Sequence, residues 1–315
     1  MLVTGGSGFI GTNLVEELAS SNFEIINLDL CGPRNQAHQK YWRRTDIRDR
    51  GQLTKQFDDF EPQYVLHLAA NTEMNKHSYS SNIDGTINMV DAVIKSPSVE
   101  KVLFFSTMLV NKNGLAEASL TAYSGDTRYG KSKILAEQYI LSQQSQLPNY
   151  FILRPTSIWG EWFGEPYRQF FEFILKGLYV HPKDQRVSRT FGYVQNLVAQ
   201  VRYLLDCSYD LMDEKILYLG DFVPLDIYNW SCSIAEIAQV KRPIEIPSIL
   251  FLTAAKFGDL SKKIGMGFPM TTFRYHNMTR DNVHEVISNL RLNSFSQEQG
   301  ITRTLNWLRQ QDQFR

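Results

Sequence analysis

The chain has 315 residues, 43% of them apolar, and its 33 basic and 33 acidic residues cancel. These values indicate a globular protein with a substantial core, and they give no reason to expect nucleic acid or an anionic membrane as a partner. Three cysteines without metal-like spacing indicate reduced thiols and no metal site. With no room for a signal peptide and no apolar run near the roughly 20 residues of a membrane span, we expect a soluble, cytoplasmic protein.

The first half of the chain alternates short apolar runs with amphipathic stretches, a pattern typical of a parallel sheet with crossover helices. After Leu2 and Val3, strands are expected at 24–29, 63–68, 101–106 and 150–153. Helices are expected from Ile10 to Leu18 and at 52–58, 83–95 and 128–144. The alternation stops after Pro155, so we expect a dinucleotide-binding part at 1–158 and a smaller, mixed part at 159–315. A helix at 196–205 and a strand at 215–219 can return residues 194–220 to the main sheet.

A glycine-rich turn, Thr4-Gly5-Gly6-Ser7-Gly8-Phe9-Ile10-Gly11, joins the first strand to the first helix. Its glycines let backbone N–H groups approach a pyrophosphate at the positive end of a helix. Asp29 closes the next strand, where a carboxylate can bind the adenosine ribose and repel the extra phosphate of NADP. NAD is therefore the expected cofactor, although Arg34, Arg43 and Arg44 lie nearby. An ordinary tight turn and a solvated acid are the structural alternatives.

Tyr129 and Lys133 lie four residues apart in an expected helix and so share one of its faces. A free phenol has a pKa of about 10, and a nearby cation favours its phenolate form. The pair can therefore act as an acid and base. Its structural alternative is a surface pair on an amphipathic helix.

Several motifs occur together over about half of the chain: the glycine turn, Asp46-Ile47, His67-Leu68-Ala69-Ala70, Asn82-Ile83-Asp84-Gly85-Thr86, Ser106-Thr107, Tyr129 with Lys133, and Leu153-Arg154-Pro155. In this order they resemble the extended short-chain dehydrogenase/reductase family, within its nucleotide-sugar epimerase/dehydratase group. The resemblance implies a doubly wound α/β fold of the Rossmann type with a smaller mixed α/β substrate-binding part at the C-terminal end. It also implies NAD, a nucleotide-diphosphate sugar as substrate, and a homodimer formed through helices 83–95 and 128–144.

The resemblance also implies roles for individual residues. Tyr129 would be the acid/base, Lys133 would hold the nicotinamide ribose and Thr107 would bind the reacting sugar oxygen. Cofactor contacts are expected from Gly5, Gly8, Phe9, Ile10, Gly11, Asp29, Asp46, Ile47, Leu68, Ala69, Ala70 and Lys133. Substrate contacts are expected from Met108, Arg189 and Arg274, with Arg186 as a substitute for Arg189 and Asn277 near Arg274. A structural role for Asn82 is as good an interpretation as a role in the site, and Asp84 is expected to be exposed.

The chain also departs from the family pattern. Dehydratases of the family carry an acidic pair directly after the active-site threonine, where this chain has Met108 and Leu109, which cannot transfer a proton. Further differences are Asn111-Lys112, the insertion 123–126, and Asn196, where many relatives have aspartate. The aromatic stretch with Trp159, Trp162, Phe163 and Tyr167 can stack on a sugar or base, or it can pack in the core or a lid.

The sequence therefore predicts an NAD-dependent nucleotide-sugar epimerase, acting at C4 through a transient 4-keto sugar and serving polysaccharide biosynthesis. One alternative is a nucleotide-sugar 4-ketoreductase that uses external NAD(P)H. The other is a non-catalytic nucleotide-binding protein, against which the intact set Thr107, Tyr129 and Lys133 argues.

Overall fold

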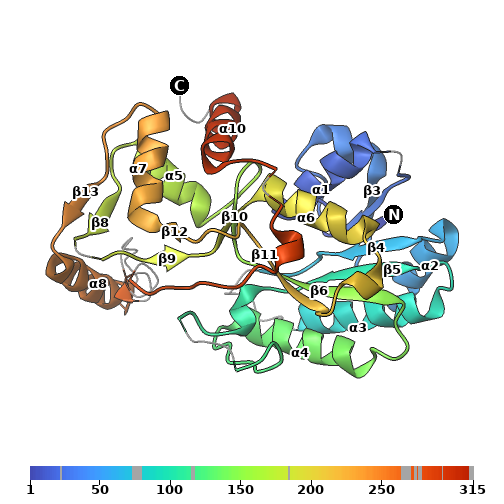
Figure 1. Cartoon of the computed structure of the whole chain (residues 1–315). Helices are drawn as coiled ribbons and strands as arrows, with labels where there is room; N and C mark the ends of the chain where they lie inside the picture. The colour runs from blue at the N-terminus through green and yellow to red at the C-terminus, as the bar shows by residue number, and fades with distance from the viewer. Residues whose placement is uncertain are drawn as a thin grey trace.

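A computed structural model describes residues 1–21, 23–72, 80–114, 118–183, 185–263, 271–272, 275, 279–292 and 294–311. Seven parallel strands form the central sheet in the order β11-β6-β5-β4-β1-β2-β3 (Figure 1). Their bounds are β1 (Leu2–Thr4), β2 (Ile26–Asp29), β3 (Trp42–Arg44), β4 (Tyr64–His67), β5 (Lys101–Phe105), β6 (Asn149–Pro155) and β11 (Ile216–Leu219). The doubly wound parallel sheet expected from the sequence is confirmed.

Each face of the sheet carries its own hydrophobic core, because successive side chains of a strand point to opposite faces. In β5, Leu103 and Phe105 belong to one core, whereas Val102 and Phe104 belong to the other. The first core packs against α1 (Phe9–Ser20) and α6 (Val194–Asp206). The second packs against α2 (Arg50–Phe60), α3 (Ser80–Lys95) and α4 (Arg128–Ser142), which lie on the opposite side of the sheet in Figure 1.

The elements expected in the first half of the chain are present, with ends that differ by a few residues. The expected strand at 215–219 is β11, which pairs with β6 at the edge of the sheet. Within the seven-stranded sheet, β3 was not expected; it pairs with β2 at the opposite edge. The division of the chain at residue 158 stays a prediction.

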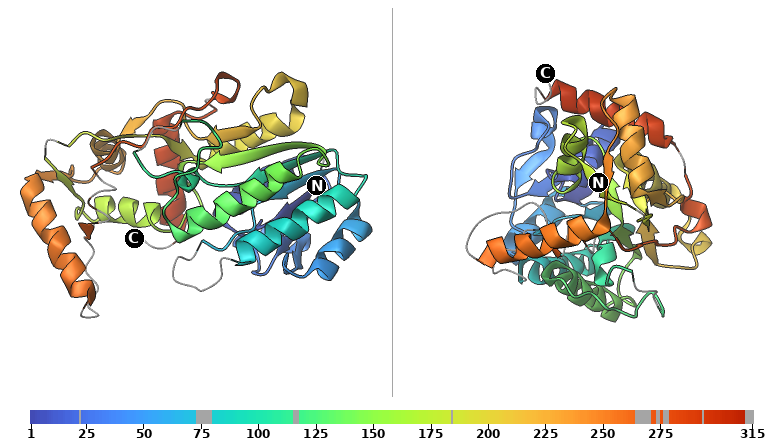
Figure 2. Two further views of the ribbon diagram at one scale, coloured as in Figure 1. Left: turned by 90° about the horizontal axis from the view of Figure 1, so that it is seen from below. Right: turned by 90° about the vertical axis from the view of Figure 1, so that its left-hand side faces the viewer.

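Apart from α6 and β11, which pack on or join the main sheet, most of the C-terminal part lies at one end of the sheet and contains short strands and helices (Figure 2). Strand β10 (Phe191–Tyr193) pairs with β7 (Ser157–Trp159), β12 (Leu225–Asp226) with β9 (Ser188–Arg189), and β13 (Ile244–Ile246) with β8 (Val180–Pro182). Besides α6, the helices that the structure describes in this part are α5 (Tyr167–Leu175), α7 (Ile227–Ile237), α8 (Ser248–Lys263) and α10 (Gln297–Gln310). Short 3-10 helices are η1 (Gln36–Tyr41), η2 (Met108–Val110), η3 (Tyr209–Leu211) and η4 (Ser288–Leu290).

The aromatic residues that follow β6 build this part's core. Trp159 and Phe163 are buried, and the Trp159 ring lies 5.3 Å from the ring of Trp230. Tyr167 packs edge-on against Phe191. For these residues the structure confirms the packing interpretation. Among the described helices, each is too short or too polar to cross a lipid bilayer.

Candidate active site

The carboxyl ends of β1 and β4 form the crevice of the sheet, because the chain proceeds from these neighbouring strands in opposite directions. Ligands of doubly wound sheets bind at such a switch point. The two strand ends approach closely: a β-carbon on Gly5 would lie 2.6 Å from the backbone nitrogen of Ala69. Gly5 also has φ of +72°, so only glycine fits there without strain. Leu68, Ala69 and Ala70 follow β4 along the crevice and are half-buried.

Polar side chains of β2 bind the backbone of the glycine turn. Gly6 donates its N–H to Oδ1 of Asn27 at 3.0 Å, and Ser7 donates to Oδ2 of Asp29 at 3.1 Å. The other oxygen of Asp29 accepts the N–H of Cys31, so the half-buried carboxylate stays beside the turn.

Helix α1 begins directly after this turn with Gly8 as its N-cap. Within the described part of the chain, no side chain caps this end. The N–H groups of its first turn, from Phe9 to Gly11, are therefore available to a ligand. A glycine cradle, free amides and the positive end of a helix fit the pyrophosphate of a dinucleotide.

The Tyr129–Lys133 pair comes from the start of α4, which Thr127 caps by accepting the N–H of Gly130 at 2.9 Å. This first turn packs against η2, whose cap is Thr107. The contact is so close that a β-carbon on Gly130 would collide with the carbonyl oxygen of Leu109. The structure therefore brings Tyr129 and Lys133 to the carboxyl end of β5, next to Thr107.

Lys133 is 3% exposed. Burial lowers its pKa to about 8, although the charge of Glu137 opposes this shift. Burial likewise raises the pKa of Tyr129 to about 12. Lys133 alone therefore does not make Tyr129 a phenolate, and a further positive charge is needed for Tyr129 to act as a base.

Asn82 makes structural hydrogen bonds beside the site. Its Oδ1 accepts the N–H of Asn71 at 2.6 Å, and its Nδ2 donates to Asn71 O and to Ser132 Oγ. It thereby ties the segment after β4 to α4, one residue from Lys133. Ser132 and Asn82 are both buried.

On the substrate side, Asn282 joins two of the residues expected to contact the sugar nucleotide. It forms a backbone bridge with Arg189, and its Nδ2 lies 3.6 Å from the Met108 sulfur and 3.2 Å from Asn113 Oδ1. Arg189 is buried, and it donates to the carbonyl of Arg280 at 3.3 Å. Asn282 was not predicted from the sequence, because a single asparagine in an aperiodic segment gives no signal.

The remaining expected residues lie apart from this centre or are held by other partners. The Asp46 carboxylate accepts hydrogen bonds from Arg48, which lower its pKa, and Ile47 packs beside Gly85. Arg186 is exposed and pairs with Glu245 at 2.9 Å. Arg274 and Asn277 lie outside the described residues.

The insertion 123–126 folds onto η2, where the N–H groups of Ser124 and Gly125 donate to the Val110 carbonyl. Asn196 holds Asp221: its Nδ2 lies 2.8 Å from Oδ1 of that carboxylate. Burial raises the pKa of Asp221 to about 6.

Known proteins with similar sequences identify the family to which this site belongs. Residues 1–216 match the NAD dependent epimerase/dehydratase family. A 4-epimerase of N-acetyl-α-D-glucosaminyl-diphospho-undecaprenol from Escherichia coli O157:H7 is 26% identical over 98% of this chain and 94% of its own. A dTDP-L-rhamnose 4-epimerase from Burkholderia thailandensis is 29% identical over 51% of this chain and 49% of its own.

Solved structures share the fold. A UDP-glucose 4-epimerase from Thermotoga maritima superposes with a TM-score of 0.76, at 21% identity and 99% coverage of both chains. A UDP-glucose 4-epimerase from Thermus thermophilus in complex with NAD gives 0.71, at 24% identity and 98% coverage of both chains. The resemblance inferred from the motifs is thus confirmed. The chain belongs to the NAD-dependent epimerase/dehydratase family of enzymes, and its cofactor is NAD.

Proposed function

We propose that the chain is a nucleotide-sugar epimerase that inverts C4 of a hexose through a transient 4-keto sugar. The observation that carries this proposal is Lys133, a lysine buried at 3% exposure, one helical turn after Tyr129 and close to the crevice. Its position suits the ribose hydroxyls of a dinucleotide lying in the crevice. When bound, NAD supplies the chemistry of hydride removal and return.

Tyr129 would remove the proton of the C4 hydroxyl and later return it to the oxygen of the ketone. Because the pKa of Tyr129 is about 12 in the protein alone, the phenolate needs Lys133 and the positive charge of the nicotinamide together. Thr107 would donate a hydrogen bond to the same sugar oxygen. Proton and hydride both return to the substrate, so the cycle has no net oxidation or reduction.

The residues after Thr107 argue against dehydration. Met108 is buried, and its sulfur accepts a hydrogen bond from Asn282 Nδ2. Neither Met108 nor Leu109 can transfer a proton. A 4-ketoreductase would use the same phenol, lysine and crevice, so it stays the second hypothesis. The relatives named as 4-epimerases favour the epimerase.

The carrier of the sugar is a second question. Met108 and Arg189, joined by Asn282, would face a nucleotide diphosphate. The E. coli relative, which matches nearly the whole chain, is named for a lipid-linked diphosphate sugar instead. Both carriers share the diphosphate, so the test must include both.

The first experiment is proton NMR of the purified protein with UDP-, GDP-, CDP- and dTDP-hexoses and an undecaprenyl-diphosphate sugar, each with and without NADH. Conversion to the C4 epimer without NADH is expected. Turnover only of a 4-keto sugar with NADH would replace the epimerase with the reductase. A protein that converts none and never reduces its cofactor would be the non-catalytic binding protein.

A single substitution tests the role of Tyr129. Tyr129→Phe is expected to reduce the rate roughly 100- to 10,000-fold, because general acid and base catalysis is lost. NAD binding should stay unchanged. The matched control is Tyr139→Phe on the same helix, whose hydroxyl bonds Asp91 on α3, and it should keep its activity. Near-normal turnover by Tyr129→Phe would end the proposed mechanism.

The assembly and cellular setting complete the proposal. A homodimer through α3 and α4, a cytoplasmic location and a role in surface-polysaccharide assembly are predictions from the family resemblance. Helices α3 and α4 pack side by side on one face of the sheet, which supports their use as a joint surface (Figure 1).

A further inference from the structure

A buried ion pair lies directly behind the proposed acid/base residues. Glu137 follows Tyr129 by eight residues and Lys133 by four, so all three lie along one side of α4. Its two carboxylate oxygens accept hydrogen bonds from Nε and Nη2 of Arg154 on β6, at 3.0 and 2.7 Å. The two side chains are 1% and 0% exposed. The proposed reaction uses neither Glu137 nor Arg154.

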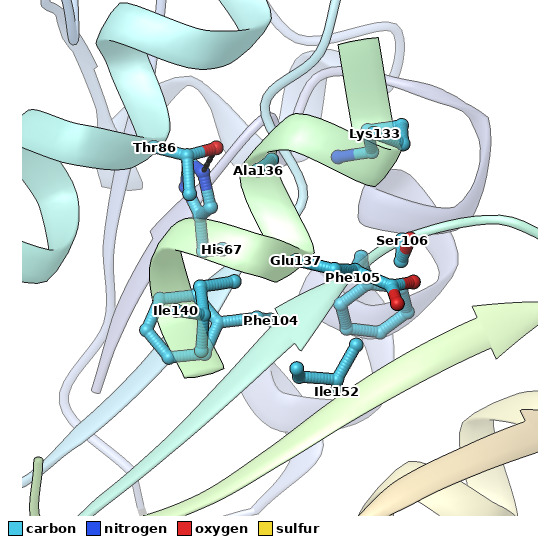
Figure 3. A pocket seen from close by; sticks show the side chains of 10 residues that line it. All are labelled: His67, Thr86, Phe104, Phe105, Ser106, Lys133, Ala136, Glu137, Ile140 and Ile152. Atoms are coloured by element: carbon cyan, nitrogen blue, oxygen red, sulfur yellow. Dashed lines mark hydrogen bonds between the residues drawn. The ribbon is translucent and has the colours of Figure 1, made fainter. Parts of the chain in front are cut away.

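Lys133 and Glu137 share a small cavity, which Ser106 also lines from the end of β5 (Figure 3). The cavity measures about 10 Å³, which is room for one water molecule at most. Among the described residues, the buried hydroxyl of Ser106 has no hydrogen-bond partner. So little water gives weak screening, and the carboxylate and the ammonium therefore interact more strongly than on a surface.

The pair is also oriented. Glu137 lines the cavity and Arg154 does not, so the negative end of the pair is the end next to Lys133. Arg154 is held on its far side by the hydroxyl of Tyr218 at 3.2 Å and the carbonyl of Leu120 at 2.7 Å. A neutral pair with this orientation stabilises a positive charge at Lys133 without adding a net charge to the interior.

We propose that the Glu137–Arg154 ion pair acts through this cavity to keep Lys133 positively charged, which makes Glu137 a positioning residue for the Tyr129–Lys133 pair. Burial of a lysine favours its neutral form, and a neutral Lys133 would give Tyr129 no cation. The importance of this charge for catalysis rests on the proposed function. The effect on Lys133 itself does not.

The other titratable groups around Lys133 are neutral, so Glu137 is the group that can stabilise the Lys133 charge. His67 on β4 lies on the same cavity and is neutral, because burial lowers its pKa to about 3. Tyr129 on α4 is a neutral phenol in the protein alone. Around Arg154, the rings of Tyr123 and Tyr218 lie 5.6 and 5.5 Å from the guanidinium, and burial raises the pKa of Tyr123.

Removal of the Glu137 charge and removal of the Arg154 charge should therefore shift the pKa of Lys133 in opposite directions. Glu137→Gln removes the anion and leaves the Arg154 cation, so it should lower the pKa of Lys133 by about 1 or more. Arg154→Gln leaves the anion alone and should raise it. Arg154→Lys keeps the charge and should change it little. A purely structural role of the pair would not give opposite shifts.

The measurement is NMR titration of protein labelled with carbon-13 at the lysine Cε atoms, in which the signal lost in Lys133→Arg identifies Lys133. Circular dichroism checks the fold of each variant. If Arg154→Gln does not fold, Glu137→Gln and Arg154→Lys still test the proposal, since only the first should move the titration. The proposal would be overturned if the pKa of Lys133 were the same in Glu137→Gln and wild type. It would also be overturned if this pKa moved by the same amount and in the same direction in Glu137→Gln and in the Arg154 variants.

A second measurement separates this inference from the proposed function. The pH dependence of kcat/KM for the substrate found by NMR should change in Glu137→Gln in parallel with the titration of Lys133. If the titration moves and no substrate is ever converted, the charge relation stands and the epimerase proposal fails. If the sugar is converted but Lys133 titrates as in wild type, the epimerase stands and this inference fails.

Discussion

A buried imidazole joins the two strands whose ends form the cofactor crevice. Thr86 Oγ1 donates its only proton to Asn82 O, so His67 Nε2, 3.2 Å away, must be the donor to Thr86. His67 Nδ1 then accepts the proton of Thr4 Oγ1 at 2.9 Å, while Thr4 Oγ1 accepts the N–H of Ala69. In this series of hydrogen bonds, which runs from Asn82 through His67 to Ala69, each donor has an acceptor only when His67 is neutral.

His67 should therefore make stability depend on pH. Burial lowers its folded pKa to about 3, so between this value and its unfolded pKa of about 6.5 the unfolded state binds more protons. Stability from His67 is full above the unfolded value and is lost as pH falls. From about pH 7.5 to about pH 5, the loss should be about 2 kcal/mol.

Urea unfolding of wild type and His67→Gln at several pH values measures this effect. Glutamine can keep one donor and one acceptor at this position, but it does not titrate. The difference in unfolding free energy between the two proteins should shrink as pH falls. A difference that is constant with pH would show that His67 is not buried as a neutral base.

At the level of elements, Lys101 fixes the end of α6 onto the sheet. It begins β5, is 6% exposed, and donates from Nζ to the carbonyls of Leu204, Leu205 and Cys207 at 2.8 to 2.9 Å. Helix α6 ends at Asp206, so these are carbonyls without helical partners, at the negative end of the helix dipole.

Lys101→Met should destabilise the protein by roughly 2 to 4 kcal/mol, since it leaves buried carbonyls without donors. Chemical unfolding measures the loss. Lys95→Met, at the exposed end of α3, is the matched control and should change stability by no more than about 0.5 kcal/mol. Activity per folded molecule should stay unchanged, because Lys101 lies at the amino end of β5, whereas the crevice lies at the carboxyl ends of the strands. A loss no larger than that of the control would contradict this role.

The elements that the sequence predicted are those whose pattern reflects their burial. The strand 101–106 is apolar because both of its faces lie in cores, and α4 shows a helical spacing of buried residues. Strand β3 has no such pattern, because Trp42, Arg43 and Arg44 form an edge strand with two exposed arginines. The strands outside the main sheet are two or three residues long and depend on partners distant in sequence.

The same distinction applies to the site. The glycine turn and the Tyr129–Lys133 pair are local motifs, so the chain itself displays them. Asn282 and the Glu137–Arg154 pair acquire their roles only through contacts across the fold. Arg154 was part of a recognised motif, yet nothing in the sequence joins it to Glu137, seventeen residues earlier on another element.

For the whole molecule, the proposed homodimer depends on one face of the protein. Helix α4 exposes Arg128, Lys131, Leu135 and Gln138 along one side, and Leu135 is an apolar side chain that is 50% exposed at the middle of this stripe. Alongside it, α3 contributes half-buried isoleucines at 83, 87 and 94. An apolar centre with a polar rim is the usual arrangement of a protein interface.

Leu135→Glu should therefore convert the dimer into a monomer, because a twofold axis through α4 would place two carboxylates at the centre of one apolar interface. Analytical ultracentrifugation over a range of concentrations measures the change. Leu211→Glu is the matched control, since Leu211 is 65% exposed in η3, away from α3 and α4, and this variant should remain dimeric. A wild-type monomer, or a Leu135→Glu variant that stays dimeric while it folds normally, would exclude this face as the interface. The crevice of each subunit would then function without a second copy beside α4, and the Tyr129–Lys133 helix would owe its position to the Asn82 and Glu137 contacts within its own chain.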